Sequence, residues 1–394
     1  MTHQVPMDLL REKTPTSLYV HIPFCKSRCF YCDFNTYVAP EHVMENYANA
    51  LDAEFAQLAP AAAAPLQTVF FGGGTPTLPP LSILERMLKS LRAHFAFADD
   101  AEVTFESNPD SIDVAKLRLL REYGVNRLSF GAQTFRDRLL LTIGRSHDAK
   151  TVIEGVEAAA GVGFAHINVD LMFGLPEQSL ADVDHALSQV LSLPVDHLSA
   201  YWLKVEAGTP FGKWREMGEL PLPGEDLEAD MYQMVRERLV AAGYAHYEIS
   251  NFARVNGHAK HNLVYWRNAP YFAAGAGAHG YVGGARYENE RRLAPYMAAL
   301  GAGNRPIADE HAVSLREAAE DSMMLGLRLA EGVSRAAFKA RFGVEIEQLY
   351  GGLIPELLER GWLLCVDDAY RIPDDLWPVA NVIFEKFVTA DVLD

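Results

Sequence analysis

Residues 25–32 read Cys25-Lys26-Ser27-Arg28-Cys29-Phe30-Tyr31-Cys32, a C-x3-C-x2-C loop that holds three of the four cysteines of the chain. Thiolates bind iron–sulfur clusters and zinc, and this spacing lets one short loop wrap a metal centre. An electron-carrying cluster or a structural zinc normally takes four protein ligands, whereas three cysteines leave one iron open to a small molecule. The loop therefore predicts a [4Fe–4S] cluster on Cys25, Cys29 and Cys32, with zinc completed by His21 as the alternative.

The composition of the 394-residue chain is that of a globular protein, with 49% hydrophobic and 22% charged residues and a formal net charge of -17. Because phosphate contacts need a basic surface, this balance argues against a general nucleic-acid binder. No run of eighteen apolar residues occurs, so we expect no integral membrane segment and leave only peripheral membrane contact open. Clustered cysteines indicate a metal site in a reducing compartment, which we take to be the cytoplasm.

Six apolar, β-rich runs alternate with helical patterns in the first half of the chain. The expected strands cover residues 17–22, 68–71, 102–105, 127–130, 167–172 and 197–202. The expected helices between them cover residues 41–56, 81–95, 111–123, 149–161 and 180–191, with caps at Asp110-Ser111 and Ser179. Such alternation implies parallel strands joined by right-handed crossovers, in either an open doubly wound sheet or a (β/α) barrel.

Polar or glycine-rich residues follow every one of these strands, which favours the barrel. In barrels the functional residues gather at the carboxyl ends of all strands, whereas an open sheet concentrates them at one switch point. The residues concerned are the cysteine loop, Gly72-Gly73-Gly74-Thr75-Pro76, Glu106-Ser107-Asn108-Pro109, Gln133, Asp170 with Gly174-Leu175-Pro176, and Tyr201. We therefore predict an α/β fold built as a partial (β/α)6 TIM-like barrel.

The pattern changes after residue 224, where a long helix at 225–242 precedes a stretch rich in His, Asn and Gly. From residue 313 helical segments alternate with short turns, and Tyr370-Arg371-Ile372 is typical of a brief strand. We expect an N-terminal extension (1–16), the partial barrel (17–224), a linker region (225–310) and a smaller, mostly helical C-terminal domain (311–394).

Several motifs together resemble the radical S-adenosylmethionine (SAM) superfamily, and within it the coproporphyrinogen III oxidase-like branch. The resemblance covers about residues 17–290 and is weaker beyond. It rests on the cysteine loop, Tyr19-Val20-His21-Ile22-Pro23-Phe24, Gly72-Gly73-Gly74-Thr75-Pro76, Asp170-Leu171-Met172-Phe173-Gly174-Leu175-Pro176 and His261-Asn262-Leu263-Val264-Tyr265-Trp266. In that superfamily the open iron chelates SAM, and reductive cleavage gives a 5′-deoxyadenosyl radical.

The resemblance implies which residues contact SAM, and their chemistry agrees. Glycines expose backbone amides to a ligand, while carboxylates at strand ends accept hydrogen bonds from amines or ribose hydroxyls. Tyr31 is expected to pack on the adenine or to shield the cluster. The implied SAM contacts are Tyr19, Tyr31, Gly73, Gly74, Thr75, Glu106, Gln133, Arg145 and Asp170.

Two relatives within this branch differ at one position. The anaerobic coproporphyrinogen III dehydrogenases carry a further cysteine two residues after the third ligand, where this chain has Phe34. Cys32-Asp33-Phe34 and the H-N-x-x-Y-W run are instead similar to the HemW-like heme chaperones, which are proposed to pass heme to apo-proteins such as respiratory enzymes. This similarity places a heme site in residues 225–310, with His261 as the candidate axial ligand and His279 as a second candidate.

The sequence leaves three candidate functions to be tested. The first is a heme chaperone that binds heme, a [4Fe–4S] cluster and SAM, and the second is a radical SAM oxidoreductase acting on a porphyrinogen. The third, an RNA-modifying enzyme, is disfavoured by the acidic balance. Whether the protein is an enzyme is left open, because Phe34 puts the dehydrogenase activity in doubt. No catalytic residue is assigned, and Cys365 is interpreted as a buried small hydrophobic residue.

Overall fold

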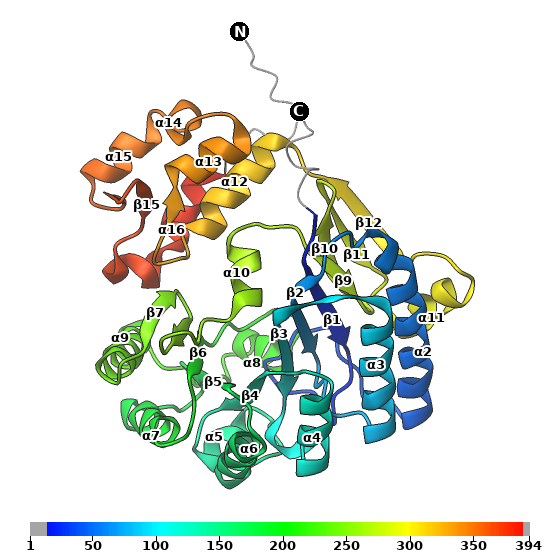
Figure 1. The fold of residues 1–394 in the computed structure, drawn as a ribbon. Helices are drawn as coiled ribbons and strands as arrows, with labels where there is room; N and C mark the ends of the chain where they lie inside the picture. The colour runs from blue at the N-terminus through cyan, green and yellow to red at the C-terminus, as the bar shows by residue number, and fades with distance from the viewer. Residues whose placement is uncertain (1–13, 389–394) are drawn as a thin grey trace.

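The computed structural model describes residues 14–388, so most of the predicted extension 1–16 and the last six residues lie outside the described part. Six parallel strands run in sequence order, each hydrogen-bonded to the next. They are β1 (Ser17–Ile22), β2 (Leu66–Gly73), β3 (Phe97–Ser107), β4 (Arg127–Gln133), β5 (His166–Phe173) and β6 (His197–Trp202). The strand order is linear, so the sheet curves without closing and the predicted partial barrel is confirmed (Figure 1).

Helices join successive strands and form an arc on the outer side of the sheet (Figure 1). They are α2 (Glu41–Leu58), α3 (Leu81–His94), α4 (Val114–Glu122), α5 (Asp137–Thr142), α6 (Ala149–Val162) and α7 (Leu180–Leu191). Ser179 caps α7 in a capping box with Asp182, as expected. The expected cap at Asp110-Ser111 is wrong: residues 109–111 form a 3-10 turn, and Asp113 accepts from the Lys116 amide instead.

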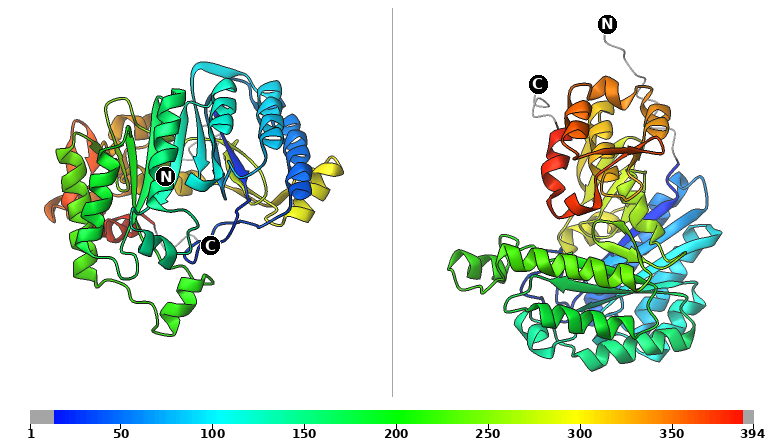
Figure 2. Two further views of the ribbon diagram at one scale, coloured as in Figure 1. Left: turned by 90° about the horizontal axis from the view of Figure 1, so that it is seen from below. Right: turned by 90° about the vertical axis from the view of Figure 1, so that its left-hand side faces the viewer.

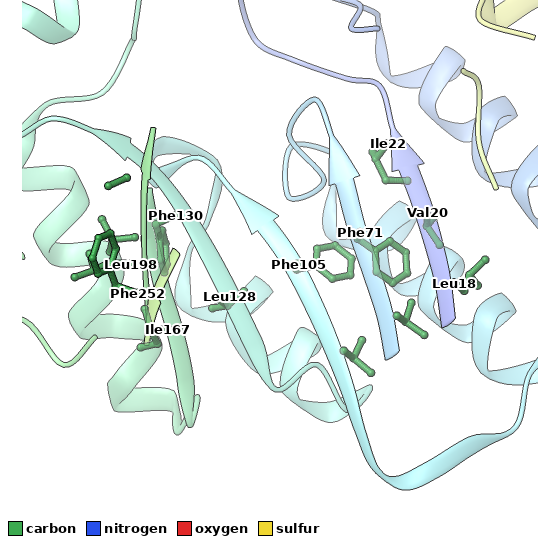
Figure 3. Packing of buried hydrophobic residues seen from close by; sticks show 14 of the residues in the cluster. Leu18, Val20, Ile22, Phe71, Phe105, Leu128, Phe130, Ile167, Leu198 and Phe252 are labelled. Atoms are coloured by element: carbon green, nitrogen blue, oxygen red, sulfur yellow. The ribbon is translucent and has the colours of Figure 1, made fainter. Parts of the chain in front are cut away.

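The main core lies between the sheet and these helices. Since side chains alternate along a strand, every second residue points outward to the helices. Figure 3 shows these outward side chains stacked from strand to strand, among them Leu18, Val20, Phe71, Phe105 and Phe130, all of which are buried. The inward positions are therefore left to the polar residues that line the half barrel.

Residues after β6 complete both edges of the sheet and add a second, smaller one. β7 and β8 extend the sheet beyond β6, β9 pairs in parallel with β1, and β10, β11 and β12 form a separate antiparallel sheet. Their bounds and those of the neighbouring helices are α8 (Pro210–Glu216), α9 (Glu225–Ala241), β7 (Ala245–Glu248), β8 (Asn251–Ala253), α10 (Lys260–Trp266), β9 (Phe272–Ala274), β10 (His279–Val282), β11 (Ala285–Asn289), α11 (Leu293–Gly301) and β12 (Ile307–Ala312). β12 ends two residues beyond residue 310, where the linker region was predicted to end. The division of the chain into domains stays a prediction.

The C-terminal part is mostly helical and lies at one end of the barrel (Figure 2). Its helices are α12 (Leu315–Gly326), α13 (Arg335–Phe342), α14 (Ile346–Leu349), α15 (Leu353–Glu359) and α16 (Asn381–Phe384). A three-stranded sheet of β13 (Val333–Ser334), β15 (Ala369–Arg371) and β14 (Leu364–Val366) accompanies them, and β15 includes two of the three residues expected as a strand. None of the helices between residues 14 and 388 is long and apolar enough to cross a membrane.

A buried ion pair fixes α10 across the amino end of the barrel strands. Arg127 Nε donates to Glu102 Oε2 at 3.0 Å, and the two side chains are only 3% and 5% exposed. Glu102 also accepts from the amides of Lys260 and His261, the first two residues of α10. Because these amides have no partner within the helix, the carboxylate acts as the helix cap.

Glu102→Ala is therefore expected to destabilise the protein by about 3–5 kcal/mol, because it leaves Arg127 buried without its counter-charge. Urea unfolding followed by far-UV circular dichroism measures the loss. Glu154→Ala, which breaks an exposed ion pair with Lys150, serves as the control and should cost less than about 1 kcal/mol. Equal small losses in both variants would show that the pair does not hold α10.

Candidate functional site

The cysteine loop follows β1 and is fixed to the barrel at its start. The Cys25 amide donates to the Tyr37 carbonyl at 3.0 Å, which closes the loop on itself. The Thr75 amide donates to the Phe24 carbonyl at 2.8 Å, which ties the loop to the residues after β2. The two segments richest in predicted site residues are therefore neighbours.

The aromatic residues inside the loop anchor its far side. The Phe30 amide donates to the Ile143 carbonyl, and the Phe30 carbonyl accepts from the Phe211 amide. The Phe30 ring packs on Phe211 and Trp214, in a small apolar cluster separate from the main core, and Tyr31 packs against the same cluster. Packing of this kind holds the three thiols in place without using their sulfur atoms.

The glycines after β2 are required by close packing. Gly73 has φ +111°, and a Cβ there would lie 2.5 Å from the His21 ring. A Cβ at Gly74 would lie 2.7 Å from the Phe24 carbonyl oxygen. No side chain fits at either position, so the backbone itself forms this wall of the site.

One cavity of about 130 Å³ at the carboxyl end of the strands gathers the predicted cluster and SAM residues. Only Tyr19 of the implied SAM contacts is absent from its lining. The predicted residues that line it are Cys25, Cys29, Cys32, Tyr31, Gly73, Gly74, Thr75, Glu106, Gln133, Arg145 and Asp170. Segments from five strand ends and one loop thus meet at one place, as the barrel prediction requires.

The thiols in this cavity are desolvated. Burial raises the pKa of Cys25 above its usual range and raises that of Cys32 to about 11. Cys25 Sγ lies 3.7 Å from Thr75 Oγ1, and Cys29 Sγ accepts from Arg145 Nη1 at 3.5 Å. Three soft donors beside one cation suit a cluster that takes a thiolate at each of three corners.

The donor set does not suit a single zinc ion completed by His21. His21 Nδ1 lies 2.9 Å from the Tyr19 hydroxyl, and Nε2 lies 3.0 Å from the Asn35 carbonyl oxygen, so both ring nitrogens are occupied. Within residues 14–388, no three His, Cys, Asp or Glu side chains lie close enough together to hold one metal ion. The occupied ring nitrogens therefore argue against zinc completed by His21.

Two carboxylates face the cavity and make no ion pair with any residue between 14 and 388. Glu106 Oε2 accepts from the Gly73 amide at 3.1 Å, and Asp170 accepts from Asn168 Nδ2 at 2.7 Å and from Ser129 Oγ. Burial raises the pKa of Glu106 to about 8, helped by the nearby Asp170, and burial also raises the pKa of Asp170. A cationic or hydroxyl-rich ligand would supply the donors that these oxygens lack.

Arg145 and Gln133 complete the wall on the side of β4. Arg145 donates to Asn108 Oδ1 at 2.8 Å and to the Gly131 carbonyl, so its guanidinium is held between two strand ends and Cys29. Gln133 has φ +66°, a left-handed conformation that is strained for a residue with a side chain. Strain of this kind persists where surrounding structure enforces it, which is common at binding sites.

Tyr19 and His261 lie outside this cavity. Tyr19 lines a neighbouring cavity, where its hydroxyl bonds His21. His261 is fully buried beneath it: Nδ1 lies 2.8 Å from Thr68 Oγ1, Nε2 lies 2.8 Å from the Tyr265 hydroxyl, and burial lowers its pKa to about 3. In this arrangement His261 offers no nitrogen to an added ligand.

Sequence reasoning did not assign roles to Asn108 and Ser129, which also line the cavity. Asn108 Nδ2 donates to Thr75 Oγ1 and Ser129 Oγ donates to Asp170, so both orient predicted residues. The signal for Ser129 was available, because it alternates with Arg127 and Gly131 on the inward face of β4. Asn108 stood within the polar segment that follows β3.

Comparisons with known proteins agree with this geometry. The model of the radical SAM superfamily matches residues 19–190, and that of the HemN C-terminal domain matches residues 313–374. Coproporphyrinogen III oxidase (HemN) from Escherichia coli, a radical SAM enzyme, superposes with a TM-score of 0.85 and covers 97% of this chain and 92% of its own. At 24% identity this similarity shows the fold alone. The class defined by the fold and motifs is a radical SAM protein.

Curated relatives narrow the class. The heme chaperone HemW of Bacillus subtilis is 41% identical over 94% of this chain and 99% of its own length. The heme chaperone HemW of Escherichia coli is 32% identical over 95% of this chain and 98% of its own length. This chain therefore belongs to the HemW family.

The raised pKa of Glu106 predicts how stability depends on pH in the ligand-free protein. Between its ordinary value of 4.5 and about 8, the folded protein keeps a proton that the unfolded chain releases, so stability falls as pH rises through this range. Glu106→Gln lacks this loss, and its Tm should rise relative to wild type between about pH 5 and about pH 8.5. Glu122→Gln, an exposed change on α4, should show no such trend. If the difference in Tm between Glu106→Gln and the wild type did not change with pH, the raised pKa of Glu106 would be contradicted.

Proposed function

We propose that this protein is a cytoplasmic heme chaperone that binds heme, a [4Fe–4S] cluster and SAM, and delivers heme to acceptor apo-proteins, respiratory enzymes among them. The observation that carries the proposal is the pairing of two adjoining cavities. The smaller is lined by the three cysteines and two half-buried carboxylates, and a larger one of about 450 Å³ shares Phe34, Gly73 and Glu106 with it.

The residues of the smaller cavity divide between cluster and SAM in this proposal. Cys25, Cys29 and Cys32 hold the cluster, and its open iron supplies a coordination site for the amino and carboxylate groups of SAM. Glu106 and Asp170 accept hydrogen bonds from SAM, while Arg145 stabilises the thiolate of Cys29. The backbone of Gly73 and Gly74, where no side chain fits, forms the wall of the cavity beside these residues.

The larger cavity suits a flat aromatic cargo. Tyr19, Tyr265 and Tyr271 contribute rings to its walls, and the Phe34 ring at its margin is 61% exposed. Aromatic side chains stack on planar ligands and bury large apolar surface. The predicted ligand His261 lies behind Tyr265, so its binding to heme iron would require the hydrogen bond to that hydroxyl to break.

Single Cys→Ser substitutions at positions 25, 29 and 32 should each abolish cluster assembly, because a cubane with one open corner cannot lose a second thiolate. Iron and sulfide content after anaerobic reconstitution, together with equilibrium dialysis of SAM, gives the measurement. Cys365→Ser is the matched control, since Cys365 lies in the C-terminal sheet and is exposed, so its predicted burial is wrong. Cluster retention in all three loop variants would refute the cluster assignment.

Heme titration of the reconstituted wild-type protein should give a saturable Soret shift, and incubation with an apo-respiratory enzyme should move the heme to that acceptor. The same sample is mixed anaerobically with coproporphyrinogen III, SAM and a reductant. We expect no protoporphyrinogen IX, because Phe34 stands where the dehydrogenases carry cysteine. Absence of saturable heme binding would end the chaperone proposal, and product formation would establish the oxidoreductase instead.

A further inference from the structure

The cavity beside the cluster site is lined by four aromatic residues, two histidines, one arginine and two acidic residues. About 450 Å³ in volume, it is lined among others by Tyr19, His21, Tyr265, Tyr271, His279 and Arg291. Its walls come from β1, α10, β10 and the segment after β11, so residues far apart in sequence meet there. A cavity of this size and composition can take a planar ligand larger than an amino acid.

Of the histidines in and behind this cavity, His279 has a free ring nitrogen. Hydrogen bonds occupy both nitrogens of His21 and both nitrogens of His261. His279 has no hydrogen bond within residues 14–388, and its Nε2 lies 3.6 Å from Glu288 Oε1, an ion pair only when the imidazole is protonated, which leaves Nδ1 free. The His279 side chain is 64% exposed, so an iron ion could approach it without a change in the core.

Arg291 supplies a free cation at the same rim. Its carbonyl accepts from Asn35 Nδ2 and from the Tyr37 hydroxyl, which fixes its backbone against the cysteine loop. In the described part of the chain, its guanidinium makes no ion pair or hydrogen bond, and the residue is exposed. An arginine held in this way is suited to bind a ligand carboxylate.

We propose that heme occupies this cavity with His279, in place of His261, as the axial ligand of the iron and Arg291 paired with a propionate. This inference rests on the proposed heme-binding function and deepens it. Binding forms one bond between iron and an imidazole nitrogen and displaces a water from the iron, with no change of oxidation state. The tyrosine rings pack on the macrocycle, and the ligand stays at the surface, where an acceptor protein can compete for it.

The inference is tested by titrating three histidine variants with heme and comparing the affinity and the absorption spectrum of each with those of the wild type. His279→Ala should weaken heme binding by roughly tenfold or more, equivalent to about 1.4 kcal/mol, and lose the spectral signature of axial imidazole. His261→Gln, which keeps a hydrogen-bonding side chain in the buried position, should retain that signature. His42→Ala, an exposed histidine on α2, should titrate like wild type.

Heme and its dimethyl ester separate the role of Arg291 from general damage to the site. Arg291→Gln should weaken binding of heme but leave binding of the ester unchanged, because the ester lacks the carboxylates. Wild-type behaviour of His279→Ala, or loss of the imidazole signature in folded His261→Gln, would overturn the inference. If Arg291→Gln weakened the binding of heme and of its dimethyl ester equally, the proposed contact between Arg291 and a propionate would be overturned. If wild-type protein binds no heme, the proposed function itself fails, which is a different result.

Discussion

The buried carboxylate of Glu102 is the constraint on which the inside of the half barrel depends. Strands that bury their outward side chains under helices must turn the alternate side chains inward, and here these are polar. Glu102 pairs with Arg127 and caps α10, so both of its oxygens have partners at the amino end of the barrel. Without this closure, water would reach buried polar groups, and the position of α10 would not be defined.

At the carboxyl end of the barrel, the carboxylates lack the charged partner that Glu102 has at the amino end. Glu106 and Asp170 are partly buried, and within residues 14–388 they accept from neutral donors and make no ion pair, while burial raises the pKa of both. The free energy lost by enclosing them is recovered when a ligand brings positive charge or hydroxyl donors. The carboxylate at the amino end thus has a charged partner within the protein, whereas the two at the carboxyl end have neutral ones, as carboxylates at binding sites often do.

The sequence predicted the features of this site that depend on residues close together in the chain, and missed those that depend on residues far apart. The alternation of strand and helix units, the polar residues after each strand and the cysteine spacing are local patterns, and they predicted the barrel and the cluster loop. The SAM residues that line the cavity were implied by the family resemblance. The cap of α4 moved to Asp113 because Pro109 begins a tight turn, which the sequence pattern did not resolve. The burial of His261 depends on Glu102, some 159 residues away, and no local pattern reveals it.

Phe34 connects the two cavities and limits what chemistry they can share. Its exposed ring lies on the margin of both, at the position where the resemblance places a cysteine in the coproporphyrinogen dehydrogenases. A phenyl ring can neither donate a proton nor carry an electron through a thiol, but it can pack on a planar cargo. A cargo held there by packing, a rim histidine and an arginine would be kept out of water on one face only. Partial enclosure of this kind favours release to a partner over chemical conversion.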